Sequence, residues 1–362
     1  AGLQVHTRNQ RVAKCLGLRV VTLAELPSLD PNASIVVVPA TSVITRRLLE
    51  VLPETASQSA WCLGDDGGQG VMLTRVGHLA DPGKLSMAAI DEPTVDLGPD
   101  CVFDASTPNA RGRTTKRLLR LTQKPTDGVV SRHINRPISR LFSRFFLALG
   151  LSANHASVLC LAIGLVCAAL CAMTGPLTLM FAGLLFQFAS VFDGVDGEMA
   201  RVTLTESPRG AWIDTAIDNF TFVACLAGVV VGWLREGPGP AGVALGVTLL
   251  IAVPMTLAVL LRFVHRHGPD GSLVFIDRVV AQASDDAQTT ALRVARVLFH
   301  GLRRDVFALA LCLVCMLGSR AAIPAAVLAG LTVAVTVFVT HWSELTAAAQ
   351  KLGQLVSRPT PS

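Results

Sequence analysis

Six runs of apolar residues dominate residues 151–343 and set the strongest limit on how this chain can fold. They lie at about His155–Thr174, Leu177–Phe192, Ala211–Leu234, Ala241–Phe263, Val306–Ser319 and Ala321–Val339. A helix that crosses a bilayer needs about 20 mostly apolar residues. The second and fifth runs are shorter, so each is expected to be the apolar part of a longer helix with a polar cytosolic end. The sequence predicts an α-helical integral membrane protein with six transmembrane helices.

Residues 1–124 have a different character, because short β-like runs alternate there with turns and helical stretches. Strands are predicted at Arg19–Leu23, Ser34–Val38, Ala60–Leu63, Val71–Val76 and Cys101–Asp104, and helices at Thr41–Leu52 and Arg111–Leu121. Strands interleaved with helices are typical of an α/β domain. We therefore expect a small N-terminal α/β soluble domain in front of the membrane body.

Residues 125–150 connect these two parts and carry a basic stripe. Arginines recur every fourth residue, at Arg132, Arg136, Arg140 and Arg144, beside apolar residues at the same helical spacing. Such an amphipathic helix suits the membrane interface. The alternative is the solvated face of a soluble helix, and an apolar run that follows almost at once argues against it.

The placement of arginine predicts the orientation in the membrane. The net charge is +5, and seven arginines lie at the end of the fourth run or between it and the fifth, against only Arg235 and Arg320 on the opposite side. Because basic loops stay on the cytosolic side, both termini, including a tail at residues 346–362, are expected in the cytosol and residues 151–345 in the cytoplasmic membrane. No basic patch interleaved with aromatic residues occurs, so nucleic acid is not an expected partner.

Four aspartates stand where the second and third runs meet. Asp193 and Asp196 are three residues apart, and Asp214 and Asp218 are four apart. Either spacing places both carboxylates on one face of a helix. The connecting loop is short, so the two helices should be antiparallel neighbours whose acidic faces meet at one level of the membrane.

Four converging carboxylates repel one another and are costly to remove from water. Only Arg201 and Arg209 lie nearby as basic residues, which is too few to neutralise them. Divalent cations would do so, and a ligand set made only of oxygen favours Mg²⁺ or Mn²⁺ over zinc. Two such ions can clamp the oxygens of a diphosphate. Gly197 and Gly210 would leave room for a base or a ribose to approach.

The full pattern in this region reads DxxDGxxAR over residues 193–201, then eight residues, then GxxxDxxxD over residues 210–218. It resembles the signature of the CDP-alcohol phosphotransferase family at every fixed position. The resemblance implies a six-helix bundle, usually a homodimer, with a site that opens to the cytosol. It further implies metal ligation by Asp193, Asp196, Asp214 and Asp218, with Asp218 also accepting the proton of the acceptor hydroxyl. The implied CDP pocket is lined by Gly197, Ala200, Arg201 and Gly210.

The segment from Lys124–Gly128 to Asn135–Arg136 resembles the linker of archaeal-type family members related to di-myo-inositol phosphate phosphate synthases. Those members carry an N-terminal nucleotidyltransferase-like domain. Residues 1–124 lack a glycine-rich nucleotide loop that ends in lysine, so this domain is expected to be catalytically silent. One departure is Ala153-Asn154, where family members often have Pro-Asn.

The expected reaction is a direct displacement. An acceptor alcohol, either a polyol phosphate or a lipid alcohol, attacks the phosphorus distal to cytidine in a CDP-alcohol donor, and CMP leaves. Positioning and charge neutralisation dominate such transfers. A transporter that uses intramembrane carboxylates as an ion path is the alternative. It explains the aspartates but not the glycines, Ala200 or Arg201 at their spacings.

Overall fold

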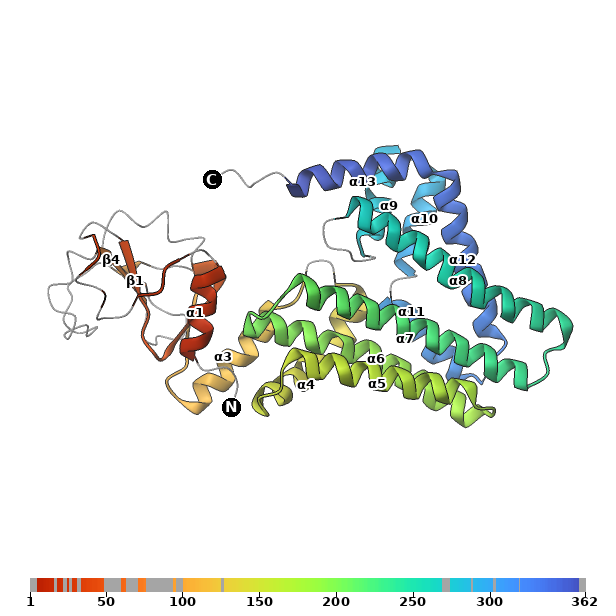
Figure 1. The fold of residues 1–362 in the computed structure, drawn as a ribbon, viewed down its shortest axis with the longest axis horizontal. Coiled ribbons are helices and arrows are strands. Elements are labelled where there is room, and N and C mark those ends of the chain that lie inside the picture. The colour runs from red at the N-terminus through yellow and green to blue at the C-terminus, as the bar shows by residue number, and fades with distance from the viewer. Residues whose placement is uncertain are drawn as a thin grey trace. The chain divides into compact units, whose positions relative to one another are not determined.

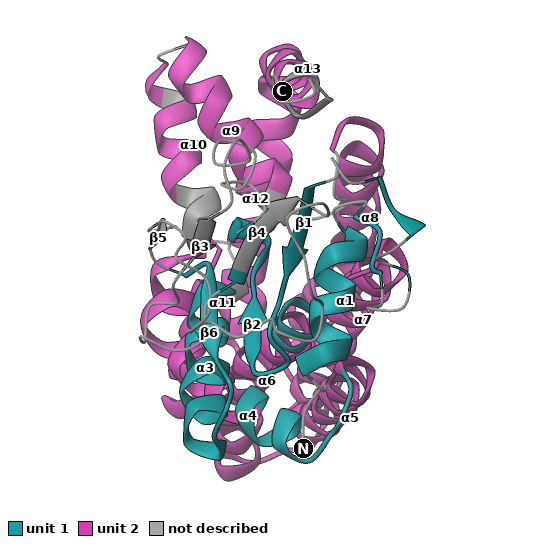
Figure 2. Ribbon diagram, turned by 90° about the vertical axis from the view of Figure 1, so that its left-hand side faces the viewer, with its two compact units in different colours: residues 1–122, 143–152, 198–205 teal, residues 123–142, 153–197, 206–362 magenta. Residues whose placement is uncertain are grey.

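The computed structural model describes residues 5–15, 18–21, 25, 28–30, 34–48, 60–62, 71–75, 94–95, 100–124, 127–268, 274–287, 289–301, 304–318 and 320–357. The chain divides into two compact units, coloured in Figure 2. Unit 1 contains residues 1–122, 143–152 and 198–205, and unit 2 contains residues 123–142, 153–197 and 206–362. One segment of the long helix that bears the first two aspartates thus belongs to unit 1.

Unit 1 contains a small strand region flanked by helices. Its elements are α1 (Val5–Cys15), β1 (Ser34–Val37), β2 (Ser42–Ile44), β3 (Ala60–Cys62), β4 (Val71–Arg75), β5 (Thr94–Val95), β6 (Val102–Asp104) and α3 (Pro108–Leu121). One sheet has the order β1-β4-β3-β5, with β3 and β5 parallel and the other pairs antiparallel, while β2 pairs with β6 in a second, antiparallel sheet. Val12, Ile44 and Val102 belong to its apolar core.

Two local predictions in this unit differ from the structure, and one helix was missed. The helix predicted at Thr41–Leu52 is wrong at its start: residues 46–48 are helical, but Ser42–Ile44 form strand β2, because Val43 and Ile44 pair with β6 and are almost fully buried. Tertiary pairing here overrides local propensity. No strand forms at residues 19–21 of the predicted Arg19–Leu23, and its last two residues lie outside the described part of the chain. Helix α1 was not anticipated.

Unit 2 is helical, and five of its helices are long and apolar enough to cross a membrane (Figure 1). These are α5 (Ala153–Ala172), α6 (Pro176–Thr203), α7 (Pro208–Arg235), α8 (Gly239–His267) and α12 (Ala322–Thr340). The other helices are a π-helical turn η5 (Ser131–Asn135), α4 (Arg136–Ala148), α9 (Val274–Ala287), α10 (Thr290–Gly301), α11 (Arg304–Met316) and α13 (Trp342–Ser357). The last residues of α4 and α6 belong to unit 1.

The fifth predicted span, at Val306–Ser319, corresponds to α11, which has 13 residues. At about 1.5 Å per residue it is roughly 20 Å long, short of a hydrocarbon core of about 30 Å. The helix stops where Gly318 adopts a left-handed backbone with φ +71°. By contrast α6 has 28 residues, as expected for an apolar run with a polar extension. The described residues thus contain five candidate spans rather than six.

Helices α5 and α7 pack in direct backbone contact. A Cβ at Gly228 would meet the carbonyl oxygen of Ala168, and one at Gly232 would meet that of Cys171. Glycines four residues apart on one helix face permit such an approach between membrane helices. This contact fixes the position of α7, which carries the second pair of aspartates.

Two arginines cap the C-terminal end of α5. Arg320 is 3% exposed and donates to the carbonyl oxygens of Cys171 and Met173, while its Nε lies 2.9 Å from a carboxylate oxygen of Glu236. Arg235 donates to the carbonyl oxygen of Ala172 at 2.8 Å. We call Arg235, Arg320 and Glu236 the arginine clamp. Arg235 and Arg320 were the two arginines expected on the side opposite the basic loops, and both donate hydrogen bonds to backbone carbonyl oxygens.

Candidate active site

The turn between α6 and α7 is short and well capped. Ser207 has an extended backbone, and its Oγ accepts a hydrogen bond from the Gly210 N–H at 3.0 Å. Pro208 occupies the first helical position, where its missing N–H costs nothing. The sequence Ser-Pro-Arg-Gly therefore starts α7 only four residues after the end of α6, and the two helices carry their aspartates to one place.

Three of the four motif aspartates come together. One carboxylate oxygen each from Asp193, Asp214 and Asp218 lies within 4.8 Å of the other two. All three side chains are partly buried. We call these three residues the carboxylate cluster. Three like charges at this distance, offering only oxygen, form a site that can hold a divalent cation.

Asp196 is not among the three carboxylates that meet within 4.8 Å. It is 8% exposed, and its Oδ2 accepts a hydrogen bond of 2.6 Å from the Ser157 hydroxyl on α5. Ser157 was not singled out from the sequence, although a hydroxyl near the start of an otherwise apolar span is the signal that could have found it. Whether Asp196 also binds metal stays a prediction.

The residues predicted to line the nucleotide pocket lie on the same two helices. Gly197 follows Asp196 on α6 and donates its N–H to the Oδ1 of that residue. Ala200 and Arg201 lie in the last turns of α6 and are partly buried, whereas Gly210 is exposed in the first turn of α7. Their proposed contacts with a nucleotide stay predictions.

Polar side chains link the turn η5 to helix α6, a few residues before Asp193. The Asn135 side chain donates to Ser190 Oγ at 3.3 Å and accepts from Gln187 Nε2 at 3.1 Å. Arg136 follows directly, and a Cβ at Gly194 would stand 2.9 Å from its Nη1. The wide π-helical turn η5 precedes these two residues, and such turns often occur at functional sites.

Arg136 differs from the other arginines of the predicted stripe because it is buried in an ion pair. Its Nε and Nη2 donate to the two carboxylate oxygens of Asp127 at 3.0 and 2.9 Å. Burial alone would raise the pKa of Asp127, but the hydrogen bonds and charge of Arg136 hold it below its usual value. Arg132 and Arg144 are exposed, as expected for residues at a lipid surface. The predicted interfacial helix thus also contributes a buried structural pair.

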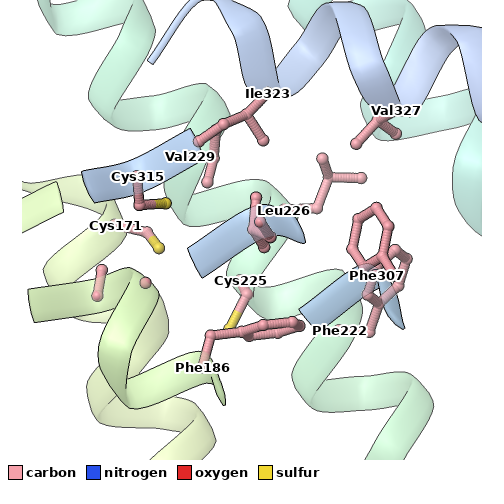
Figure 3. A pocket seen from close by; sticks show the side chains of 13 residues that line it. Cys171, Phe186, Phe222, Cys225, Leu226, Val229, Phe307, Cys315, Ile323 and Val327 are labelled. Atoms are coloured by element: carbon pink, nitrogen blue, oxygen red, sulfur yellow. The ribbon is translucent and has the colours of Figure 1, made fainter. Parts of the chain in front are cut away.

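A separate apolar cavity lies within unit 2 (Figure 3). Its volume is about 20 Å³, and Phe186, Phe222 and Phe307 surround it together with the thiols of Cys225 and Cys315. A space of this size holds about one water molecule and is too small for a substrate. The cavity is a gap in helix packing, and the carboxylate cluster remains the candidate site.

Comparison with known families defines the class of protein. The model of the CDP-alcohol phosphatidyltransferase family matches residues 151–355. That is more than half of the chain and includes every motif residue. The chain therefore belongs to this family of membrane-bound transferases, and it is an enzyme. The sequence-based resemblance is confirmed, and the transporter interpretation is set aside.

Particular relatives carry the name bifunctional IPC transferase and DIPP synthase. The chain is 37% identical over 128 residues to the protein of Thermococcus kodakarensis, which is 34% of this chain and 28% of that protein. It is 40% identical over 129 residues to the protein of Rubrobacter xylanophilus, which is 36% of this chain and 29% of the relative. The match thus spans less than a third of either relative's length. It agrees with the predicted likeness to di-myo-inositol phosphate phosphate synthases.

Proposed function

We propose that this protein is a metal-dependent CDP-alcohol phosphotransferase that moves a phospho-alcohol group from a CDP-alcohol to an acceptor alcohol and releases CMP. The observation that carries the proposal is the carboxylate cluster, in which the two arms of the family motif meet within 4.8 Å. Two Mg²⁺ or Mn²⁺ ions bound there would neutralise the diphosphate of the donor.

The roles of the chain's own residues follow from their positions. Asp193, Asp214 and Asp218 are proposed to hold the metal ions. Asp196 is a proposed further ligand, whose carboxylate the Ser157 hydroxyl orients from α5. Asp218 also takes the proton of the acceptor hydroxyl as that oxygen attacks phosphorus.

The nucleotide side of the site is assigned to the small and basic residues of the motif. Gly197, Ala200 and Gly210 present no large side chain, so a base and ribose can lie against the two helices. Arg201 is proposed to hold a phosphate oxygen of the donor.

The substrates are proposed by class. The relatives' names combine an IPC transferase with a DIPP synthase, which supports a role in inositol-phosphate-type or phospholipid synthesis. A lipid donor with a polyol phosphate acceptor and a CDP-polyol donor with a lipid or inositol-phosphate acceptor both satisfy the proposed chemistry. We further propose a homodimer in the cytoplasmic membrane whose site and termini face the cytosol.

The test is CMP release by the purified full chain in lipid nanodiscs, with CDP-diacylglycerol and CDP-polyols as donors and polyol phosphates and lipid alcohols as acceptors. We expect turnover that requires an acceptor and Mg²⁺ or Mn²⁺ and stops with a chelator. An Asp285→Asn variant serves as control, because this exposed acid pairs only with Arg296 among the described residues. CMP release that is unaffected by the chelator would contradict the metal dependence.

A further inference from the structure

Helix α6 ends two residues after Arg201, and each of its last four carbonyl groups accepts a hydrogen bond. A helix leaves its last four carbonyl groups without partners inside the helix. Here the carbonyl oxygen of Ala200 accepts from the Thr205 N–H at 2.9 Å, and that of Arg201 from the Leu204 N–H at 3.3 Å. These two bonds form a Schellman motif. Two carbonyl groups, those of Val202 and Thr203, remain.

Two arginines from the first helix of the chain donate hydrogen bonds to both remaining carbonyl groups. Arg8 Nε donates to the Val202 carbonyl oxygen at 3.1 Å, and Arg11 Nη1 donates to that of Thr203 at 2.7 Å. Both arginines lie on α1, one turn apart. Their positive charges also suit the negative end of the helix dipole. Helix α1 of the head, meaning residues 1–122, therefore caps α6.

Arg8 is held in place for this contact. It is 7% exposed and also donates to the Ile44 carbonyl oxygen at the end of β2. Burial and the charge of Arg46 lower the pKa of Arg8 to about 10, so the guanidinium stays charged at neutral pH. A buried cation that bridges a strand of the head to the end of α6 ties the two elements together.

Leu204 shows a second, independent adaptation. It adopts the left-handed conformation that a Schellman motif requires, with φ +55°, where glycine is usual and a branched side chain is strained. Its side chain packs against the apolar core of the head, which includes Val12 and Ile44. Glycine would form the turn with less strain but could not make this contact. Leucine at this position therefore gains the contact with the core of the head and accepts the strain of the left-handed backbone.

We infer that the head is a positioning domain, in which Arg8, Arg11 and the pocket for Leu204 fix the end of α6 and so orient Arg201 for the nucleotide. This inference rests on the proposed function, since Arg201 is assigned there to the donor. It gives a catalytically silent head a role in the reaction. Arg8 and Arg11 act through the backbone of α6 and are positioning residues.

The experiment compares the full chain with its Arg8→Gln/Arg11→Gln variant in nanodiscs. The first readout is hydrogen exchange of the Leu204 and Thr205 amides, which needs no ligand. We expect faster exchange by about tenfold or more in the variant. The second readout is binding of CMP, used as the probe. Its Kd should rise by about tenfold, below the 10²-fold that a 1 Å misplacement can cost. The Mn²⁺ affinity should change by less than about twofold, because the cap adjoins the proposed nucleotide residues and not the carboxylate cluster.

Two further variants keep the test decisive. Arg113→Gln removes an exposed arginine of the head and should change neither exchange nor CMP binding. Leu204→Gly retains the turn but removes the side chain that packs against the head, and it should weaken CMP binding several-fold. This variant serves as the test if Arg8→Gln/Arg11→Gln folds poorly. Unchanged exchange and unchanged CMP affinity in the double variant would overturn the inference. If the wild-type protein binds no CMP, the proposed function fails, while the exchange data still decide the cap.

Discussion

The carboxylate cluster and the arginine clamp are both sets of charged residues in unit 2, but they combine their charges in different ways. In the clamp, Arg320 has an opposite charge and two carbonyl oxygens as partners. In the cluster, three groups of the same charge are brought within 4.8 Å. The first arrangement pairs opposite charges, whereas the second brings like charges together and would gain stability from the proposed cation.

The comparison indicates which charges serve the fold and which serve the reaction. Charges of the clamp close the end of α5, so their loss should reduce stability and leave chemistry intact. Charges of the cluster oppose one another, so the loss of one should spare the fold and stop turnover. The predictions below test this difference.

The largest effect is expected from Asp193→Asn and Asp214→Asn. Each removes one of the three carboxylates proposed to bind metal, and CMP release should fall by more than about 10²-fold. Loss of an outer-shell group alone lowers metal affinity or activity by about 10–100-fold. The thermal unfolding midpoint without added metal should stay the same or rise, because like-charge repulsion is relieved. Near-wild-type turnover in both variants would show that the cluster does not hold the metal.

Asp218→Asn should have a large effect of a different kind. If this residue is also the general base, turnover falls by about 10²-fold while metal still binds, though more weakly. The measurement is CMP release at saturating Mg²⁺ together with a Mn²⁺ titration. Full recovery of activity at high metal concentration would show that Asp218 is only a ligand.

Arg320→Gln tests the other side of the comparison. It leaves two carbonyl groups and Glu236 without their partner, and we expect a loss of about 2 kcal/mol in stability, the usual range for unsatisfied polar groups. The loss is moderated because Glu236 is 40% exposed and water can reach it. Activity per folded molecule should be unchanged.

Thermal unfolding in nanodiscs measures the Arg320→Gln effect, with Arg266→Gln as control because Arg266 is exposed near the end of α8. Adding Glu236→Gln should recover part of the lost stability. A stable Arg320→Gln variant with impaired turnover would erase the distinction between clamp and cluster.

Helical periodicity explains why much of the site could be predicted. Spacings of three and four residues, with a short turn between two spans, were enough to expect that the four motif aspartates would meet, and three of them do. Helix α6 was predicted as a long helix with a polar end because its apolar run was short for a span. The family motif then gave these residues a chemistry that periodicity alone could not.

The remaining features depend on contacts between distant parts of the chain. Arg8 and Val202 are 194 positions apart, and no local pattern links a basic helix in the head to the end of a membrane span. The β-branched pair at Val43 and Ile44 became a strand because β6 was available to pair with it. Helix α11 ends early at a left-handed glycine, and hydropathy does not register backbone conformation.

The smallest predicted effect concerns Asp196, which shares features with both the carboxylate cluster and the arginine clamp. It belongs to the motif, yet its carboxylate accepts a hydrogen bond from Ser157 at 2.6 Å. Ser157→Ala removes this bond, together with a longer one of 3.4 Å from the same hydroxyl to the Ala153 carbonyl oxygen of its own helix. If Asp196 is a metal ligand, the Mg²⁺ concentration for half-maximal CMP release should rise by about threefold, less than the 10-fold lower end for outer-shell groups because a single neutral donor is lost. Thr332→Val is the control, since within the described part of the chain this hydroxyl bonds the Leu328 carbonyl of its own helix. An unchanged Mg²⁺ requirement in Ser157→Ala, combined with reduced thermal stability, would place Asp196 with the arginine clamp as a structural charge.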